Sequence, residues 1–164
     1  MNNLNRRIAQ SIRTRPDFVR CKAAKGEPGE YLIVNLTFTR GSEAPPFILH
    51  AIELADGPRL RVLAPHVAEF CSASDAEGFC DLANRTCRIG RFFFSASDSR
   101  AVNYVAEQFF ARGCNPLGIV ERMIDYTLGW MATCRKAAEE LSARAQMETS
   151  LRAALPRCLH PEFN

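Results

Sequence analysis

Residues 31–39 read Tyr-Leu-Ile-Val-Asn-Leu-Thr-Phe-Thr, and this stretch decides the class of fold. Apolar and polar side chains alternate along it, one face holding Leu32, Val34, Leu36 and Phe38 and the other Asn35, Thr37 and Thr39. Successive side chains of a β-strand point to opposite sides of the sheet. The pattern therefore predicts a half-buried antiparallel strand, with one face toward a core and the other toward water.

Further strands are expected on both sides of this one. Residues 18–23 and 47–54 are apolar and β-branched enough for strands, and 60–63 gives a short fourth strand closed by Pro65. Turn-forming sequences separate them, such as Asp56-Gly57. Strands that follow each other in sequence usually pair. Residues 18–63 therefore predict an antiparallel meander.

The next segment combines a helix with a strand pair. Ser74 and Glu77 have the spacing of a capping box, which predicts a helix over 75–86. Residues 88–94 and 101–110 are rich in aromatic and β-branched side chains and are separated by a polar turn. We expect them to form two antiparallel strands.

A helix is expected at each end of the chain. Leu4, Ile8 and Ile12 recur every four residues and predict a short helix over 3–13. Asn115-Pro116 is a helix start, and the apolar spacing after it predicts a long helix over 116–152, followed by a tail over 156–164. The chain is thus expected to form one α+β domain over 1–155, a twisted antiparallel sheet covered by helices.

Composition limits the class of protein. The chain has 164 residues, of which 47% are hydrophobic and 24% charged, as in ordinary globular domains. It has no run of eighteen apolar residues and no apolar leader at its start, so we expect no membrane association and a cytoplasmic location. Its seven cysteines follow no dense framework and are expected to be reduced thiols.

Positive charge is concentrated at the start of the chain. Seven lysines and arginines lie within residues 1–25 against Asp17 alone, although the whole chain has a net charge of only +3. Arg6, Arg7, Arg13 and Arg15 are the candidates for contact with nucleic acid or an anionic surface. The alternative is that these side chains form the solvated surface of a first helix and strand.

The sequence predicts no metal, cofactor or catalytic residue. Cys71, Cys80 and Cys87 are separated by eight and six intervening residues and form no C-x-x-C pair, so buried thiols explain them better than zinc ligands do. The three histidines show no local signature that joins them to a cysteine nucleophile. A thiol-dependent enzyme or redox sensor stays a third hypothesis, and it requires a reactive cysteine.

The strand pair carries the candidate binding residues, which are aromatic. Such residues dominate the energetics of protein interfaces, so we expect protein contact through Phe92, Phe94, Tyr104 and Phe110. Aromatic strand faces also stack nucleic-acid bases when basic residues surround them, and four arginines flank this block. Core packing with a partner surface is the favoured interpretation.

The junction between the second helix and the next strand resembles a known family. Leu82-Ala83-Asn84, followed by Ile89-Gly90-Arg91-Phe92, is similar to the YbjN-like family, also called bacterial sensory transduction regulators. That family shares its fold with type III secretion chaperones. Residues 75–142 follow the family's order of elements, residues 18–63 supply the preceding meander, and Gly90 and Phe92 are the matching motif positions.

The resemblance implies a helix-covered antiparallel sheet, often dimeric, with no catalytic residues to transfer. Combined with the residue patterns, it predicts a non-enzymatic protein-binding module, chaperone-like or regulatory, that acts as a homodimer. The expected partner is another protein or a peptide segment, held at sheet edges or apolar patches. Binding of nucleic acid through the basic start of the chain is the alternative.

Overall fold

The computed structural model describes residues 3–26, 29–37, 44, 46–54, 57–94, 97–111 and 114–158. They form three helices and six strands in the order α1 (Asn3–Arg13), β1 (Phe18–Gly26), β2 (Gly29–Leu36), β3 (Phe47–Leu54), β4 (Gly57–Glu69), α2 (Ala73–Thr86), β5 (Arg91–Phe94), β6 (Ala101–Phe109) and α3 (Leu117–Cys158). The expected α+β class is confirmed. Phe38 and Thr39 of the opening motif lie outside the described residues.

All six strands belong to one antiparallel sheet, in the order β1-β2-β3-β4-β6-β5. The first four strands form the expected meander. The chain then passes through α2 to the outer strand β5 and returns as β6, which lies between β4 and β5. β1 and β5 are the two edges of the sheet.

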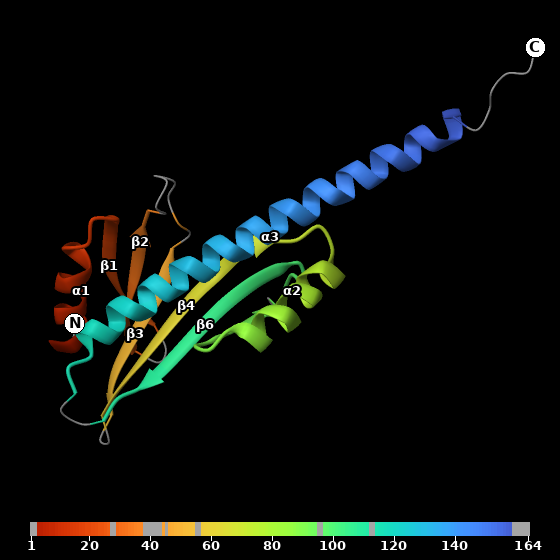
Figure 1. The fold of residues 1–164 in the computed structure, drawn as a ribbon. Helices are drawn as coiled ribbons and strands as arrows, with labels where there is room; N and C mark the ends of the chain where they lie inside the picture. Colours follow the sequence, from red (N-terminus) through yellow and green to blue (C-terminus); the bar gives the residue numbers. More distant parts are fainter. Residues whose placement is uncertain are drawn as a thin grey trace, which may run out of the picture.

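The three helices cover the same face of the sheet (Figure 1). Alternate residues of the strands point toward them and are buried, as Leu32, Val34 and Leu36 of β2 are. The apolar stripe of α1 packs there, as its spacing predicted, with Ile8 and Ile12 fully buried. The opposite face of the sheet is not covered by a helix of the described chain, and it is called the open face below.

β4 is longer than the sequence predicted. It does not end before Pro65 but continues to Glu69, with a register shift between Ala64 and Ala68. His66, inside this irregularity, has a φ of 54°, and its amide donates to Asn103 Oδ1 at 2.9 Å. A bulge tolerates a proline because the local ladder is already interrupted, which is why Pro65 does not end the strand.

Two helix boundaries also differ from the expected ones. α2 is capped by Ser72, whose hydroxyl accepts from the amide of Asp75 at 3.1 Å, rather than by the predicted Ser74 and Glu77. The same serine-to-acid spacing thus acts two residues earlier. α3 extends to Cys158, beyond the predicted end at residue 152 and into the predicted 156–164 tail.

α3 has 42 residues, which corresponds to about 63 Å of helix. Its buried positions begin at Val120 and end at Ala138. Figure 1 shows the first half lying over the sheet and the second half projecting beyond it. Among the residues of α3 whose exposure the structure describes, the contribution to the core extends to Ala138 and the partly buried Leu141.

Candidate functional site

An aromatic cluster joins α2, α3 and the β5–β6 pair. The Phe92 ring lies 5.3 Å from Phe79 of α2, 5.0 Å from Tyr104 of β6 and 5.4 Å from Trp130 of α3, measured between ring centroids. These are normal separations for tilted and edge-to-face aromatic pairs. Phe92 is 3% exposed and Tyr104 is fully buried. The cluster fixes the position of the outer strand relative to two helices.

Gly90 allows the chain to enter β5 at this point. Its φ is +85°, and a Cβ atom there would lie 2.4 Å from the Val105 carbonyl oxygen and 2.6 Å from the Tyr104 hydroxyl. That hydroxyl donates to the carbonyl of Ile89 at 2.5 Å. Only glycine adopts this conformation readily and leaves room for the phenol. Burial raises the pKa of Tyr104 far above its usual value, so the hydroxyl stays a donor.

Asn84 blocks part of the outer edge of β5. Its Oδ1 accepts from the amide of Phe92 at 2.7 Å, and its Nδ2 donates to the Phe92 carbonyl at 3.0 Å. An edge strand normally offers such backbone groups to another strand. Because Asn84 pairs with both of them, strand addition is disfavoured at this residue. Asn84, Gly90 and Phe92, which carried the family resemblance, therefore all have structural roles.

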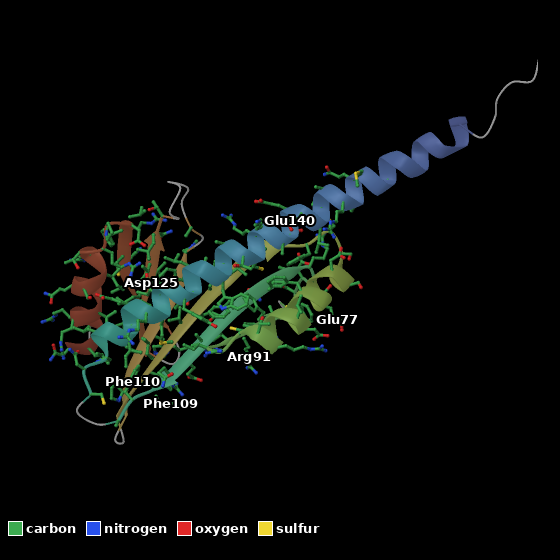
Figure 2. All side chains as sticks on the ribbon, viewed as in Figure 1. Glu77, Arg91, Phe109, Phe110, Asp125 and Glu140 are labelled. Carbon is green, nitrogen blue, oxygen red and sulfur yellow. The ribbon has the colours of Figure 1, made fainter. Side chains whose placement is uncertain are left out.

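The four predicted binding residues do not form one surface. Phe92, Tyr104 and Phe110 are at most 8% exposed and belong to the core. Phe94 is 38% exposed, next to Val102 of β6. Figure 2 shows Phe109 and Phe110 at the opposite end of β6 from α2. Contact of the three buried residues with a partner would require the core to open, whereas Phe94 is available.

Exposed apolar side chains gather instead around α2 and β5. Among the described residues, eight large apolar side chains are exposed, and four of them fall within residues 82–94. These four are called the corner patch: Leu82, Ile89, Phe93 and Phe94, at 66%, 37%, 37% and 38% exposure. Leu82 lies off the buried stripe of α2, which is formed by Ala76, Cys80 and Ala83. A leucine outside the apolar stripe of a helix is a sequence signal for exposed apolar surface, and the predicted binding residues do not include Leu82.

The basic start of the chain is partly structural. Arg15 binds both carboxylate oxygens of Asp17, at 2.9 and 2.8 Å, and reaches Asp125 of α3 at 2.6 Å. These carboxylates raise the pKa of Arg15, and the contacts tie the α1–β1 turn to the α3 helix that carries Asp125 in Figure 2. Arg6, Arg7 and Arg13 are exposed on α1. Only these three of the predicted arginines are available to an anionic partner.

The cysteines fall into buried and exposed groups. Cys80 and Cys134 are buried, and loss of hydration raises their pKa values to about 11 and about 12. Such thiols carry little thiolate at neutral pH. Cys87 is half-buried, donates to the Ile89 carbonyl at 3.0 Å and accepts from the Tyr126 hydroxyl at 3.8 Å. Its neighbours are thus a carbonyl and a phenol.

No group of three metal-binding side chains occurs within the part of the chain that the structure describes. An open hollow of about 360 Å³ lies between the end of β4 and α3, lined by Glu69, Ala138, Glu139, Ser142, Ala143 and Gln146. Glu69 forms an ion pair with Arg100 at 2.9 Å. None of the described helices is both long and apolar enough to cross a bilayer.

Comparison with models of known families and with curated proteins gives no match to this sequence. The candidate site therefore rests on the geometry of this chain. Its best-defined feature is the corner patch, held in place by the aromatic cluster beneath it.

Proposed function

We propose that this chain is a non-enzymatic protein-binding module, chaperone-like or regulatory, that acts as a homodimer. The observation that carries the proposal is the corner patch, where half of the large exposed apolar side chains of the described chain lie within thirteen consecutive residues. Exposed apolar side chains concentrated in one region are typical of protein-interaction sites. Two of its four members are phenylalanines, which supply large contact area.

The mode of contact follows from the edge of the sheet. At Phe92 the outward backbone groups of β5 are already bonded to Asn84, so a partner gains little by strand addition there. Side-chain contact across α2 and β5 is the mode that the patch supports. Phe93 and Phe94 point to opposite sides of the strand, so a partner that covers both must wrap around the edge.

The aromatic cluster gives the patch a rigid base. Phe92 packs between Phe79 and Trp130 directly behind the exposed side chains of β5. A preformed surface loses less conformational entropy when it binds. The exposed apolar groups are therefore presented on ordered elements instead of on a loop.

Polar substitution within the patch tests this function. Leu82→Glu and Phe94→Ser would remove apolar contact, and Met147→Glu, on the projecting half of α3 and 61% exposed, is the matched control. We expect native mass spectrometry to show a dimer for the wild type and the control, and a monomer for the two patch variants. Affinity capture from the source cell should lose its partners in the same two variants.

The proposal fails if Leu82→Glu and Phe94→Ser keep both the dimer and the captured partners while circular dichroism shows them folded. It also fails if Met147→Glu has the same effect as the patch variants, since the effect would then not depend on this surface.

A second candidate function is binding of nucleic acid or an anionic surface through α1. The observation in its favour is the exposure of Arg6, Arg7 and Arg13 on one short helix. Binding through phosphate contacts weakens steeply as salt rises. An affinity for nucleic acid that does not change between low and moderate salt would rule this function out.

A further inference from the structure

The open face of the sheet carries an apolar row with a cation at each end. Strand register places Lys22 opposite Ile33, Ile33 opposite Ile48, and Ile48 opposite Leu63. Leu63 is opposite Val105, which is opposite Arg91. Directly opposed residues of antiparallel strands point to the same side. Four aliphatic side chains thus cross the sheet in one line, between a lysine on one edge strand and an arginine on the other.

These aliphatic side chains are not part of the helix-covered core. Ile33, Ile48 and Leu63 are half-buried, and Val105 is 8% exposed, although the helices lie on the other side of the sheet. Long side chains next to a row of this kind cover apolar surface with their methylene stems and keep their charged ends in water. The row is therefore an apolar stripe on the face of the sheet opposite the helices.

Charge on this face is strongly one-sided. In register with the row and its two neighbouring rows, the described cationic side chains are Arg20, Lys22, Arg61 and Arg91, against the carboxylate of Glu107, and Arg59 lies one row farther out. Arg59 forms an ion pair with Glu107 at 3.3 Å, and Arg20 donates to Asn35. Lys22, Arg61 and Arg91 are exposed. Burial lowers the pKa of His50, and the positive charges of Arg59 and Arg61 lower it further.

We propose that the open face binds an acidic amphipathic helix of a partner protein, with the helix's apolar side on the Ile33–Val105 row and its carboxylates on the surrounding cations. This rests on the proposed function, because it names the chemistry of a protein partner. A sheet face offers side chains but no backbone groups. A segment that binds there must satisfy its own backbone hydrogen bonds, which a helix does.

The spacing of strands sets the size of this helix. Neighbouring strands lie about 4.8 Å apart, so the aliphatic row spans about 14 Å and the two terminal cations about 24 Å. At 1.5 Å per residue, the partner helix needs an apolar side of about ten residues, with acidic residues about sixteen residues apart. The row crosses the strands, and so does the bound helix.

Two other occupants fit less well. A second copy of the chain, face to face, would bring four cations against four and only one carboxylate from each side in these three rows. Single-stranded nucleic acid stacks on aromatic side chains. Here the central row is aliphatic, and Phe93 and Phe109 lie in the edge strand β5 and in its neighbour β6.

A synthetic peptide tests the proposal with the full chain. The probe is a fluorescein-labelled helical peptide of about twenty residues, with leucines at i, i+3, i+4 and i+7 in its centre and glutamates toward both ends. A second peptide has lysine in place of every glutamate, and a third probe is oligothymidine. Binding is followed by fluorescence anisotropy.

Charge reversal on the open face is compared with charge reversal elsewhere. Arg61→Glu should weaken binding of the glutamate peptide by about tenfold, and Arg61→Glu with Arg91→Glu by about a hundredfold. The matched control, Arg6→Glu with Arg7→Glu on α1, removes the same charge away from this face and should change binding by less than about twofold. These arginines are exposed, so each variant is expected to fold.

The proposal is overturned if the glutamate peptide does not bind saturably, if the lysine peptide binds equally well, or if the α1 control weakens binding as much as the open-face pair. Oligothymidine that binds tightly and is lost with Arg61→Glu would also overturn it, in favour of nucleic acid. Dimerisation, measured on the same variants, separates this inference from the proposed function, because the proposed dimer depends on Leu82 and Phe94 and not on the open face. A wild-type chain that is dimeric but does not bind the glutamate peptide refutes only the inference.

Discussion

The two faces of the sheet are built from the same strands but differ in how far their side chains are buried. The covered face holds Leu49, Val62 and Tyr104, all at most 1% exposed, beneath α1 and α3. The open face holds half-buried aliphatic side chains bordered by lysine and arginine. The first face stabilises the fold, whereas the second is covered by no helix of the described chain. Under the proposal above, stability and partner binding depend on alternate residues of the same strands.

Phe92 and Phe93 give the most direct test of that division, because they are neighbours on β5 that point to opposite faces. Phe92→Ala removes the centre of the aromatic cluster and should cost about 3–5 kcal/mol in the free energy of unfolding. Phe93 is 37% exposed, so Phe93→Ala should lower the free energy of unfolding by less than about 1.5 kcal/mol. Urea denaturation of both variants measures the difference. Equal losses would show that the two faces contribute alike.

Gly90 and Gly78 provide the second comparison. Gly90→Ala should destabilise by about 1–3 kcal/mol from backbone strain alone, and the clash with the Val105 carbonyl adds to this. Gly78 lies in α2 with no atom near its missing Cβ. Gly78→Ala should therefore stabilise by about 0.5–1 kcal/mol. Thermal or urea unfolding gives both values, and the same sign for the two variants would contradict the role assigned to Gly90.

The blocked edge of β5 yields the third prediction. Asn84→Ala removes two hydrogen bonds to Phe92 and should cost about 1–2 kcal/mol. It also leaves two backbone groups of the edge strand without their partner, so the variant should associate more strongly as its concentration rises. Static light scattering against concentration measures this. Arg85→Ala, one residue along the same helix, is the control and should leave association unchanged.

His50 gives the smallest expected effect and probes the open face. Its pKa is lowered in the folded state by burial and by Arg59 and Arg61. The unfolded chain therefore binds a proton more readily, and stability should fall as the pH drops below about 6.5. His50→Gln removes this contribution. The fall in the urea midpoint on acidification should be smaller in the variant than in the wild type. An equal fall in both proteins would show that His50 does not contribute.

Much of the covered face could be predicted from the sequence, because periodicity reports burial directly. The alternation of Leu32, Val34 and Leu36 gave the correct buried face of β2, and the spacing of Ile8 and Ile12 gave that of α1. The β5–β6 pair and the start of α3 followed from aromatic content and from Asn115-Pro116. Local patterns sufficed here because each element buries its apolar stripe against the same core.

The binding residues could not be predicted in the same way. Phe92, Tyr104 and Phe110 were aromatic and on paired strands, but which of them face the core depends on α2 and α3 packing above them. The apolar row of the open face depends on register across six strands, from Lys22 to Arg91, which no local pattern contains. The predicted end of the fourth strand before Pro65 was wrong for a similar reason. The bulge that tolerates this proline arises from pairing with β6, which the local sequence does not show.

The chain has a single tryptophan, Trp130, and its position has a practical consequence. The indole lies 5.4 Å from Phe92 and 6.2 Å from Tyr126, between the first half of α3 and the corner patch. Its intrinsic emission thus reports on this one junction without any label. A shift in the emission maximum when a partner is added would place the event at α2 and β5. If the emission spectrum does not change on saturation with the acidic peptide, the peptide binds without disturbing this junction, as expected for binding to the open face on the other side of the sheet.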